Sequence, residues 1–317
     1  MNYRRMGRTG IKVSEISLGS WLTYGNATER EIAFKTIETA YDLGINFFDT
    51  ANAYARGAAE VVVGEALAKY PRESFVLATK VYFPMGEGPN DKGLSRKHIM
   101  ESAHASLKRL HVDYVDILYC HRPDPETPMD ETLRAFDDLI RHGKVMYMGV
   151  SEWSAAQMRE ALHVSDRLLL DRIVVNQPQY SMLNRGIEKE IIPLGEREGI
   201  GQVVFSPLAQ GVLTGKYKPG QQAPQGSRAT DPKQNMWIGG FLGEDTLAKV
   251  ASLGIIAAEL GISMSQLALA WVLRQPNVAS ALIGASRPEQ VSENAAASGI
   301  VLDMDVLDRI EGILGDV

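Results

Sequence analysis

The chain has few of the features that mark secreted, membrane or disulfide-rich proteins. A single cysteine, Cys120, among 317 residues excludes an internal disulfide and fits a reducing compartment. No apolar run approaches the ~20 residues that a membrane-spanning helix needs. The start of the chain, residues 1–5, has no apolar signal segment. We therefore expect a cytoplasmic protein with no membrane segment.

Two further absences concern partners and fold. The formal net charge is -6 and no basic cluster is present, which argues against nucleic acid as a partner. A glycine-rich dinucleotide fingerprint is also missing, because the first expected strand ends in Leu18-Gly19-Ser20-Trp21. That absence disfavours an open, doubly wound sheet, the main rival among α/β folds.

What the chain does have is a regular alternation of strand-like and helix-like segments. Residues 1–14 predict a β-hairpin with its turn at residues 7–10. Eight apolar, strand-like runs follow, seven of them at 15–19, 45–48, 75–80, 114–119, 145–150, 173–175 and 202–205, and the last at 281–283. Eight βα units without a break in composition predict one closed (β/α)8 TIM barrel, a single domain spanning residues 1–317.

Local helix signals give narrower expectations. A helix at 28–43 is expected to open with a capping box of Thr28 and Glu31. Its buried face is expected to hold Ile32, Thr36, Ala40 and Leu43. Thr127 followed by Pro128 predicts the start of a later helix, with the threonine as its N-cap.

One long interval, residues 210–243, breaks the βα rhythm after the seventh strand. It holds Pro219, Pro224, Pro232 and seven glycines, with little periodicity. It also holds Trp237 and Phe241, which a solvated linker rarely contains. A long irregular segment inside a compact domain is usually functional or disordered. We expect a loop that folds over a bound molecule.

Polar residues fall at the ends of three consecutive strands. Asp49 and nearby Tyr54 follow the second strand, Lys80 ends the third, and His121 follows the fourth. Each has a structural alternative: a turn cap for Asp49, a solvated strand end for Lys80, a hydrogen-bonded loop histidine for His121. Barrel enzymes place their chemistry at the carboxyl ends of strands, and adjacent strands lie only ~5 Å apart. We therefore expect the four side chains to share one pocket.

Such a group suits protonation of an oxygen on which negative charge develops. Tyrosine has a reference pKa of ~10, and a nearby lysine ammonium is expected to lower it. Asp49 can keep Lys80 charged and aimed, and His121 can orient the same oxygen. The set lacks a serine–histidine or thiol nucleophile, and His121 has no partner at metal-ligand spacing. Reduction of a carbonyl with hydride from an organic cofactor is the predicted chemistry.

Candidate cofactor contacts lie on the remaining strands. Ser151, Asn176 and Gln177 suit a carboxamide, and Phe205 offers a face for stacking. The last helix begins after Gly284-Ala285-Ser286-Arg287 and can bind phosphate at its N-terminus. The cofactor set on the strand ends and the long loop is Ser20, Trp21, Asp49, Ser151, Gln177, Phe205, Ser206, Pro207, Leu208, Gln210 and Lys216. The set around the last helix is Gly284, Ser286, Arg287, Gln290 and Asn294.

Several of these runs together resemble the aldo-keto reductases. They are Asp49-Thr50-Ala51 with Tyr54, Ala78-Thr79-Lys80, residues 119–124 and Ile283-Gly284-Ala285-Ser286. Residues 93–99, 122–128 and 206–209 resemble the branch that contains the β subunits of voltage-gated potassium channels. The resemblance extends over about residues 3–315.

The resemblance implies NADP(H)-dependent interconversion of aldehydes or ketones with alcohols. It implies Tyr54 as acid/base, Lys80 and Asp49 as the groups that tune it, and His121 as the residue that orients the carbonyl. It also implies Ser151 and Gln177 at the carboxamide and Phe205 stacked on the nicotinamide. Lys216 and Arg228 are implied over the phosphates. The adenosine half is implied to lie against Ser286, Arg287, Gln290, Glu293 and Asn294.

One departure from the channel branch favours a working reductase: the channel subunits have asparagine where this chain has His121. They also have arginine where this chain has Glu152, which changes the local contact there. Phe205 replaces a bulkier aromatic often found at its position, so stacking is expected to persist with lower affinity for the nicotinamide. Two alternatives stay open: a redox-sensing NADP(H)-binding subunit with slow turnover, and a dehydrogenase that oxidises a sugar or polyol. We expect a small carbonyl substrate in a pocket walled by Trp21, Tyr82, Phe83 and Trp237, and a homo-oligomer, with a tetramer suggested by the resemblance.

Overall fold

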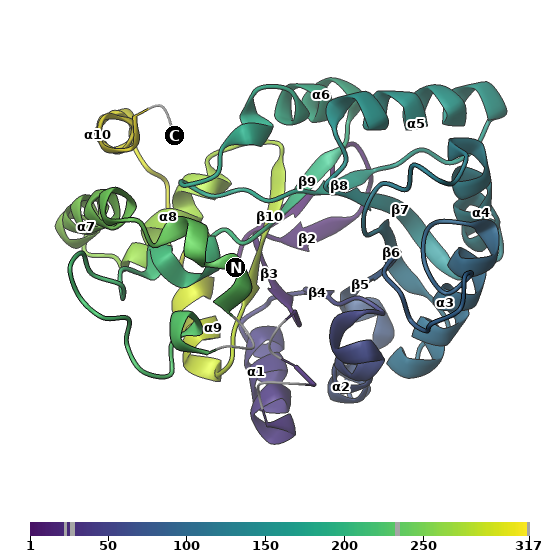
Figure 1. Ribbon diagram of the computed structural model, residues 1–317, viewed down its shortest axis with the longest axis horizontal. Coiled ribbons are helices and arrows are strands. Elements are labelled where there is room, and N and C mark those ends of the chain that lie inside the picture. The colour runs from purple at the N-terminus through teal and green to yellow at the C-terminus, as the bar shows by residue number, and fades with distance from the viewer. Residues whose placement is uncertain (22–23, 26–28, 232–234, 316–317) are drawn as a thin grey trace.

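Eight parallel strands form a closed barrel at the centre of the molecule (Figure 1). The computed structural model describes residues 1–21, 24–25, 29–231 and 235–315. Around the ring the strands follow the order β10-β3-β4-β5-β6-β7-β8-β9. Their bounds are β3 (Ile16–Gly19), β4 (Phe47–Asp49), β5 (Val76–Val81), β6 (Val115–Cys120), β7 (Val145–Ser151), β8 (Val175–Gln177), β9 (Gly201–Phe205) and β10 (Val278–Gly284). The predicted (β/α)8 barrel is confirmed.

An antiparallel hairpin, β1 (Tyr3–Arg5) and β2 (Lys12–Ser14), precedes the barrel as predicted. The side chains of Met6 and Val13 are fully buried and pack with the inward-facing side chains of the strands, among them Phe47, Val203 and Ala279. Apolar burial of this kind contributes about 25 cal/mol per Å². The hairpin therefore fills the amino-terminal end of the barrel, so the polar strand ends lie at the opposite mouth.

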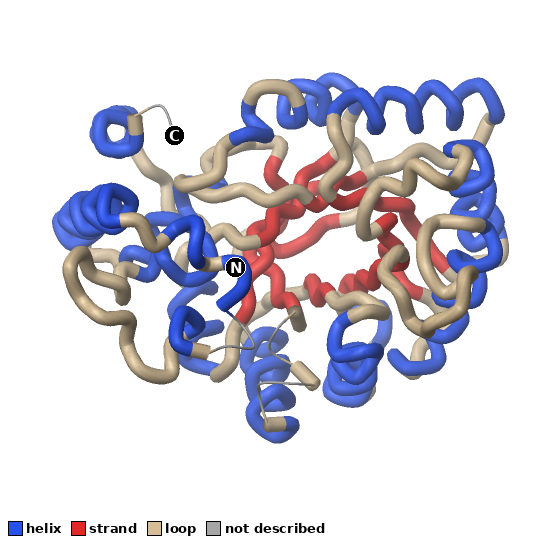
Figure 2. The backbone as a smooth tube through the Cα atoms, in the orientation of Figure 1, coloured by secondary structure: helices blue, strands red, loops and turns tan. Residues whose placement is uncertain are grey.

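Helices surround the strands on the outside, as Figure 2 shows. A second, larger cluster of buried apolar side chains lies between the two layers. The helices are α1 (Arg30–Asp42), α2 (Ala58–Leu67), α3 (Arg96–Leu110), α4 (Met129–Arg141), α5 (Ala155–Leu168), α6 (Ile191–Glu198), α7 (Glu244–Glu259), α8 (Met264–Leu273), α9 (Pro288–Ala295) and α10 (Met304–Leu314). The sequence analysis did not predict α7, α8 or α10.

Within the described residues, no single helix is long and apolar enough to cross a membrane. The consecutive helices α7 and α8 reach that length only as a pair, and the pair is bent by 91°.

Two predicted helix starts differ from the structure. α1 begins at Arg30 with Glu29 as N-cap, and Thr28 of the expected capping box lies outside the described residues. The buried face of α1 is Ala33, Thr36, Ile37 and Ala40, whereas Ile32 and Leu43 are 37% and 39% exposed. The helix packs between α2 and α9, and its buried face is therefore shifted by about one residue from the predicted face.

The N-cap of α4 is Pro128, because the hydroxyl of Thr127 donates to Asp124 instead.

In the described part of the long interval after β9, the regular elements are short 3-10 turns, in keeping with the little periodicity of its sequence. These are η4 (Ala209–Thr214), η5 (Arg228–Thr230), η6 (Asn235–Trp237) and η7 (Gly239–Phe241), and α7 begins at Glu244. Tyr217 and Ile238 are buried and belong to the outer core cluster. The segment is therefore packed onto the barrel and is not a free linker.

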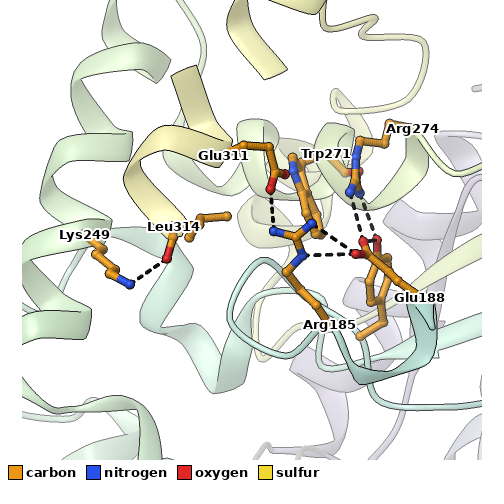
Figure 3. Close-up of polar contacts among 8 residues, drawn as sticks. Arg185, Glu188, Lys249, Trp271, Arg274, Glu311 and Leu314 are labelled. Carbon is orange, nitrogen blue, oxygen red and sulfur yellow. Dashed lines mark hydrogen bonds and ion pairs between the residues drawn. The ribbon is translucent and has the colours of Figure 1, made fainter. Parts of the chain in front are cut away.

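A network of ion pairs fixes the C-terminal helix α10 to the barrel (Figure 3). Arg185 donates to Glu311 of α10 at 2.5 Å and to Glu188 of η3 (Gly186–Glu188) at 3.0 Å. Glu188 also accepts from Arg274 at 2.9 Å, and the guanidinium of Arg274 lies 3.5 Å from the ring centre of Trp271. The network thus ties α10 and α8 to the segment between β8 and α6.

Candidate active site

The period-two alternation of strands selects the side chains that reach the barrel mouth. On β5, Val76 and Ala78 face the barrel interior, so Lys80 faces it as well, one step nearer the mouth. On β6, Ile117 and Tyr119 do the same below His121. The same parity carries three more predicted residues to the inner face, namely Asp49, Gln177 and Phe205.

A buried ion pair between Lys80 and Asp49 lies at the centre of the site. Lys80 Nζ bonds Asp49 Oδ1 and donates to the main-chain oxygen of Thr50 at 2.9 Å. Gln177 Nε2 donates to Asp49 Oδ2 at 2.9 Å from the other side of the barrel. Both carboxylate oxygens are thus engaged, and the sequence expectation that Asp49 pairs with Lys80 is confirmed.

Burial opposes the charges of this pair. It raises the pKa of Asp49 above its usual 3.8 and lowers the pKa of Lys80 below its usual 10.5. The mutual attraction of the two groups acts against both shifts. Each group therefore depends on the other to stay ionised.

Tyr54 lies beside the pair, at the start of the 3-10 turn η1 (Tyr54–Gly57). Its ring centre is 5.1 Å from Lys80 Nζ and 5.6 Å from the ring centre of His121. Ala55 and Arg56 directly after it have positive φ angles of 49° and 53°, a strained conformation for residues other than glycine. The tight turn thus holds the phenol at the barrel mouth.

The charge state of Tyr54 differs from the sequence expectation. Burial first, and the Asp49 carboxylate second, raise the pKa of the phenol well above its usual 10. The expected lowering by Lys80 does not offset these two effects, since Lys80 is paired with the Asp49 carboxylate. In this arrangement Tyr54 is a protonated phenol at neutral pH.

His121 is held in its neutral form. Burial first, then the charges of Lys80 and Arg122, lower its pKa well below the usual 6.5. Its Nδ1 atom is buried and has no hydrogen-bond partner among the described residues. A neutral imidazole with a free ring nitrogen can donate to, or accept from, a ligand at this mouth.

This burial predicts a pH dependence of stability. The unfolded chain binds a proton at His121 below about pH 6.5, whereas the folded chain does not, so acidification must destabilise the fold. We expect the wild-type chain to lose about 1 kcal/mol more free energy of unfolding between pH 7.5 and 5.5 than His121→Asn. Urea unfolding of both proteins at the two pH values measures this, and equal losses would contradict the neutral assignment.

The polar residues predicted near the carboxamide divide into two groups. Ser151 Oγ donates to the main-chain oxygen of Gln177 at 2.9 Å, and Ser20 Oγ donates to Thr50 Oγ1 at 2.8 Å, so these residues join the central network. Asn176 does not, because strand alternation turns it to the opposite face from Gln177, where it donates to Gln202 at 3.2 Å. Its expected place at the carboxamide is wrong.

Phe205 ends β9 at the barrel mouth and is half-buried. The turn that follows, Ser206-Pro207-Leu208, leads into η4, and Ser206, Ala209 and Gln210 all have positive φ angles between 45° and 59°. Gln210 Nε2 donates to Ser206 Oγ at 2.5 Å. Strain of this kind clusters at ligand sites, where surrounding contacts hold it in place.

Two cations lie within this strained loop. Arg228 is half-buried and its guanidinium donates to Gln210 Oε1, with no carboxylate of the described residues within 4 Å. Burial accordingly lowers the pKa of Arg228. Lys216 Nζ lies beside Gly211, where a β-carbon would approach it to 3.4 Å. A partly buried, unpaired guanidinium next to an ammonium fits an anionic group such as a phosphate.

The residues predicted at the last helix follow β10, the strand that pairs with β9 so that Leu282 lies opposite Phe205. Gln290 Oε1 accepts from the main-chain nitrogen of Ser286 at 2.8 Å, which orders the turn after Gly284. Arg287 is 67% exposed, and its nearest carboxylate, on Glu289, is 4.0 Å away. Glu293 is exposed and Asn294 is buried on the same helix. The turn after β10 and the start of α9 thus follow the strand next to the one that carries Phe205.

The four aromatic side chains predicted to wall the substrate pocket form two pairs, of which one contacts His121. The rings of Trp21 and Trp237 are 6.5 Å apart, so the loop after β9 meets the loop after β3. On the other side, Phe83 lies edge-on to His121 at 4.8 Å and to Tyr82 at 5.3 Å.

Sequence reasoning missed four residues of this site. Thr50 binds Lys80 through its main chain, and the ring of Tyr119 lies 5.7 Å from Lys80 Nζ. Asn52 is fully buried and neither of its side-chain polar atoms has a partner among the described residues. Arg122 lies over the face of Phe83 at 5.6 Å. Strand parity could have found Tyr119; the other three depend on loop geometry that leaves no periodic signal.

The lysine–aspartate pair, the phenol and the imidazole lie at the carboxyl ends of the strands of a closed parallel barrel, where barrel enzymes place their active sites. Residues 15–314 match the aldo/keto reductase family, and the chain belongs to that family. The family's activity is NAD(P)H-dependent carbonyl reduction.

The chain is also similar to proteins named as channel subunits. A protein of Oryza sativa subsp. japonica named "Probable voltage-gated potassium channel subunit beta" is 44% identical over 319 residues, covering 99% of this chain and 97% of the relative. A protein of Arabidopsis thaliana with the same name is 46% identical over 319 residues with the same coverage. The resemblance noted in the sequence is confirmed.

Proposed function

We propose that this protein reduces aldehydes or ketones to alcohols with NADPH, and that Tyr54 is the proton donor. The observation that carries the proposal is the buried Lys80–Asp49 pair beside a protonated phenol and a neutral imidazole at one barrel mouth. When bound, the nicotinamide supplies hydride to the carbonyl carbon. The residues of the chain then have to bind the cofactor, orient the carbonyl group and protonate its oxygen.

The roles of the four residues follow from their contacts. His121, neutral and with a free ring nitrogen, orients the carbonyl oxygen by a hydrogen bond. Tyr54 gives its proton to that oxygen as negative charge develops on it. Lys80 stabilises the phenolate that is left, and Asp49 holds Lys80 in place with help from Gln177.

Cofactor binding is proposed for the strand ends across the barrel. Since Gln177 Nε2 is already bound to Asp49, Oε1 is the atom that it offers to a carboxamide, with Ser151 next to it. Phe205 stacks on the nicotinamide. Lys216 and Arg228 bind the phosphates, and the turn at residues 284–287 with the start of α9 receives the adenosine half. In this proposal the cofactor and the carbonyl are bound by one domain, residues 1–317.

A panel of aldehydes, ketones and alcohols tests the proposal and its direction. NADPH consumption with carbonyls should exceed NADP+ reduction with sugars or polyols at pH 7. Faster turnover with polyols and NADP+ would instead identify a dehydrogenase.

The preference for NADPH over NADH is proposed to depend on Arg287, with Lys216 and Arg228. Arg287 is exposed and only loosely paired, so its charge is available to a 2′-phosphate. We expect Arg287→Met to raise the Kd for NADPH about tenfold at low salt and to leave the Kd for NADH unchanged. Arg309→Met on α10, which removes an equal charge paired with Glu259, is the matched control. Equal affinity of the wild-type chain for both cofactors would contradict this preference.

The names of the relatives support a second candidate function, a subunit of a voltage-gated potassium channel. By the resemblance noted in the sequence, such a subunit would bind NADP(H), turn over slowly and form a tetramer. Co-purification with a channel protein, together with no turnover on any carbonyl of the panel, would favour this candidate over the reductase.

A further inference from the structure

One cation at the barrel mouth has no role in the reaction as described so far. Arg122 directly follows His121 at the end of β6 and is half-buried. Its Nη1 donates to the main-chain oxygen of His121 at 2.6 Å, and its guanidinium lies 5.6 Å from the ring centre of Phe83. Phe83 in turn contacts the imidazole of His121 edge-on at 4.8 Å. Arg122 is therefore fixed against the wall of the proposed carbonyl site.

This guanidinium has no counter-charge. No carboxylate of the described residues lies within 4 Å of it. Two acids at this end of the barrel, Asp49 and Asp124, are bound to other groups. Asp49 is bound to Lys80 and Gln177. Asp124 accepts from the main-chain nitrogens of Leu94 and Glu126 and from the hydroxyl of Thr127. A half-buried arginine with free N–H groups presents a fixed fork that matches a carboxylate.

The position of Arg122 separates it from the proposed cofactor. In the ring of eight strands, β6 lies four strands from β10, directly across the barrel. The cations assigned to the cofactor phosphates follow β9 and β10, whereas Arg122 lies on the side of His121, where the carbonyl is bound. Its charge acts on this site, because it lowers the pKa of both His121 and Tyr54.

We propose that Arg122 determines substrate specificity by binding an anionic group on the substrate, so that the protein prefers aldehydes or ketones that carry a carboxylate. The inference rests on the proposed function, since the carbonyl end is held by His121 and Tyr54. The Phe83 ring beneath the guanidinium keeps the fork in place by a cation–π contact. The carboxylate then lies beyond His121, at the outer wall of the pocket.

The first test compares two substrates that differ in charge and by one methyl group, 4-carboxybenzaldehyde and methyl 4-formylbenzoate. We expect wild-type kcat/KM to favour the carboxylate. Arg122→Met should lower kcat/KM for the carboxylate about 10- to 100-fold and change that for the ester less than threefold, because one charge-assisted bidentate contact is lost. Arg122→Lys should retain part of the preference through its charge. Arg134→Met on α4, which removes an exposed charge near Asp130, should retain all of it.

The second test does not depend on turnover. Calorimetric titration of benzoate into the protein in excess NADP+ should give a Kd that rises at least tenfold in Arg122→Met and is unchanged in Arg134→Met. An unchanged Kd, or an equal loss of carboxylate and ester reduction, would overturn the role of Arg122. If no carbonyl is reduced while benzoate binding still requires Arg122, the proposed reductase activity fails and the anion site stands.

Discussion

Tyr54→Phe should lower kcat for aldehyde reduction by about 10²- to 10⁴-fold, the range for loss of a general acid. The substitution removes only the hydroxyl and keeps the ring against Lys80 and His121. No hydrogen bond joins this hydroxyl to another described residue, so the free energy of unfolding should change by less than about 1 kcal/mol. The Kd for NADPH should stay within about twofold. Steady-state kinetics and fluorescence titration measure these quantities.

Tyr41→Phe is a suitable control for that variant. The hydroxyl of Tyr41, on α1, donates to Ser74 at 2.9 Å on the outside of the barrel. Its removal should leave turnover at the wild-type level. Native turnover in Tyr54→Phe would show that the proton comes from another group.

Lys80→Met is expected to have the second large effect, on both stability and turnover. It leaves the Asp49 carboxylate fully buried with Gln177 as its remaining side-chain partner. An uncompensated buried charge costs about 3–5 kcal/mol of unfolding free energy. Turnover should fall at least about 100-fold, because the phenolate of Tyr54 loses its nearest cation. Chemical unfolding and kcat give the two results.

A double variant separates these two effects. Lys80→Met with Asp49→Leu removes both buried charges, so most of the lost stability should return while turnover stays low.

The pH–rate profile of Lys80→Met adds a second check. Tyr54 must be protonated to act as an acid, and in Lys80→Met the charge of Asp49, which raises the pKa of Tyr54, is no longer balanced by the ammonium. The fall in rate at high pH should therefore move to higher pH in this variant. An unshifted profile would argue against electrostatic tuning by Lys80.

The catalytic residues that the sequence predicted lie at strand ends or shortly after them. Lys80 and His121 could be placed because each stands at the end of an apolar run that predicts a strand, and barrel enzymes place their chemistry at those ends. The bond between Gln177 and Asp49 joins residues 128 positions apart, and only closure of the ring brings them together. For the same reason, the free charge of Arg122 cannot be read from its neighbours in the chain.

Of the helices that the sequence analysis did not predict, α8 has a physical reason for being missed and α10 does not. α8 is buried over nearly its whole length, from Met264 to Leu273, so it has no polar face and no helical period in its sequence. α10 does have such a period, since Val306, Ile310 and Leu314 are its buried residues at intervals of four. It could have been predicted. The charge state of Tyr54 could not, because the pairing of Lys80 with Asp49 cancels the effect that Lys80 alone would have.

Transfer of deuterium from cofactor to product tests the central claim most directly. The wild-type protein is mixed with an aldehyde and NADPH deuterated at both C4 positions, and the product is analysed by mass spectrometry. The account predicts an alcohol that carries one deuterium on its carbinol carbon, formed at least about 100-fold more slowly by Tyr54→Phe. An alcohol without deuterium, or no alcohol from any aldehyde although NADPH binds, would contradict it.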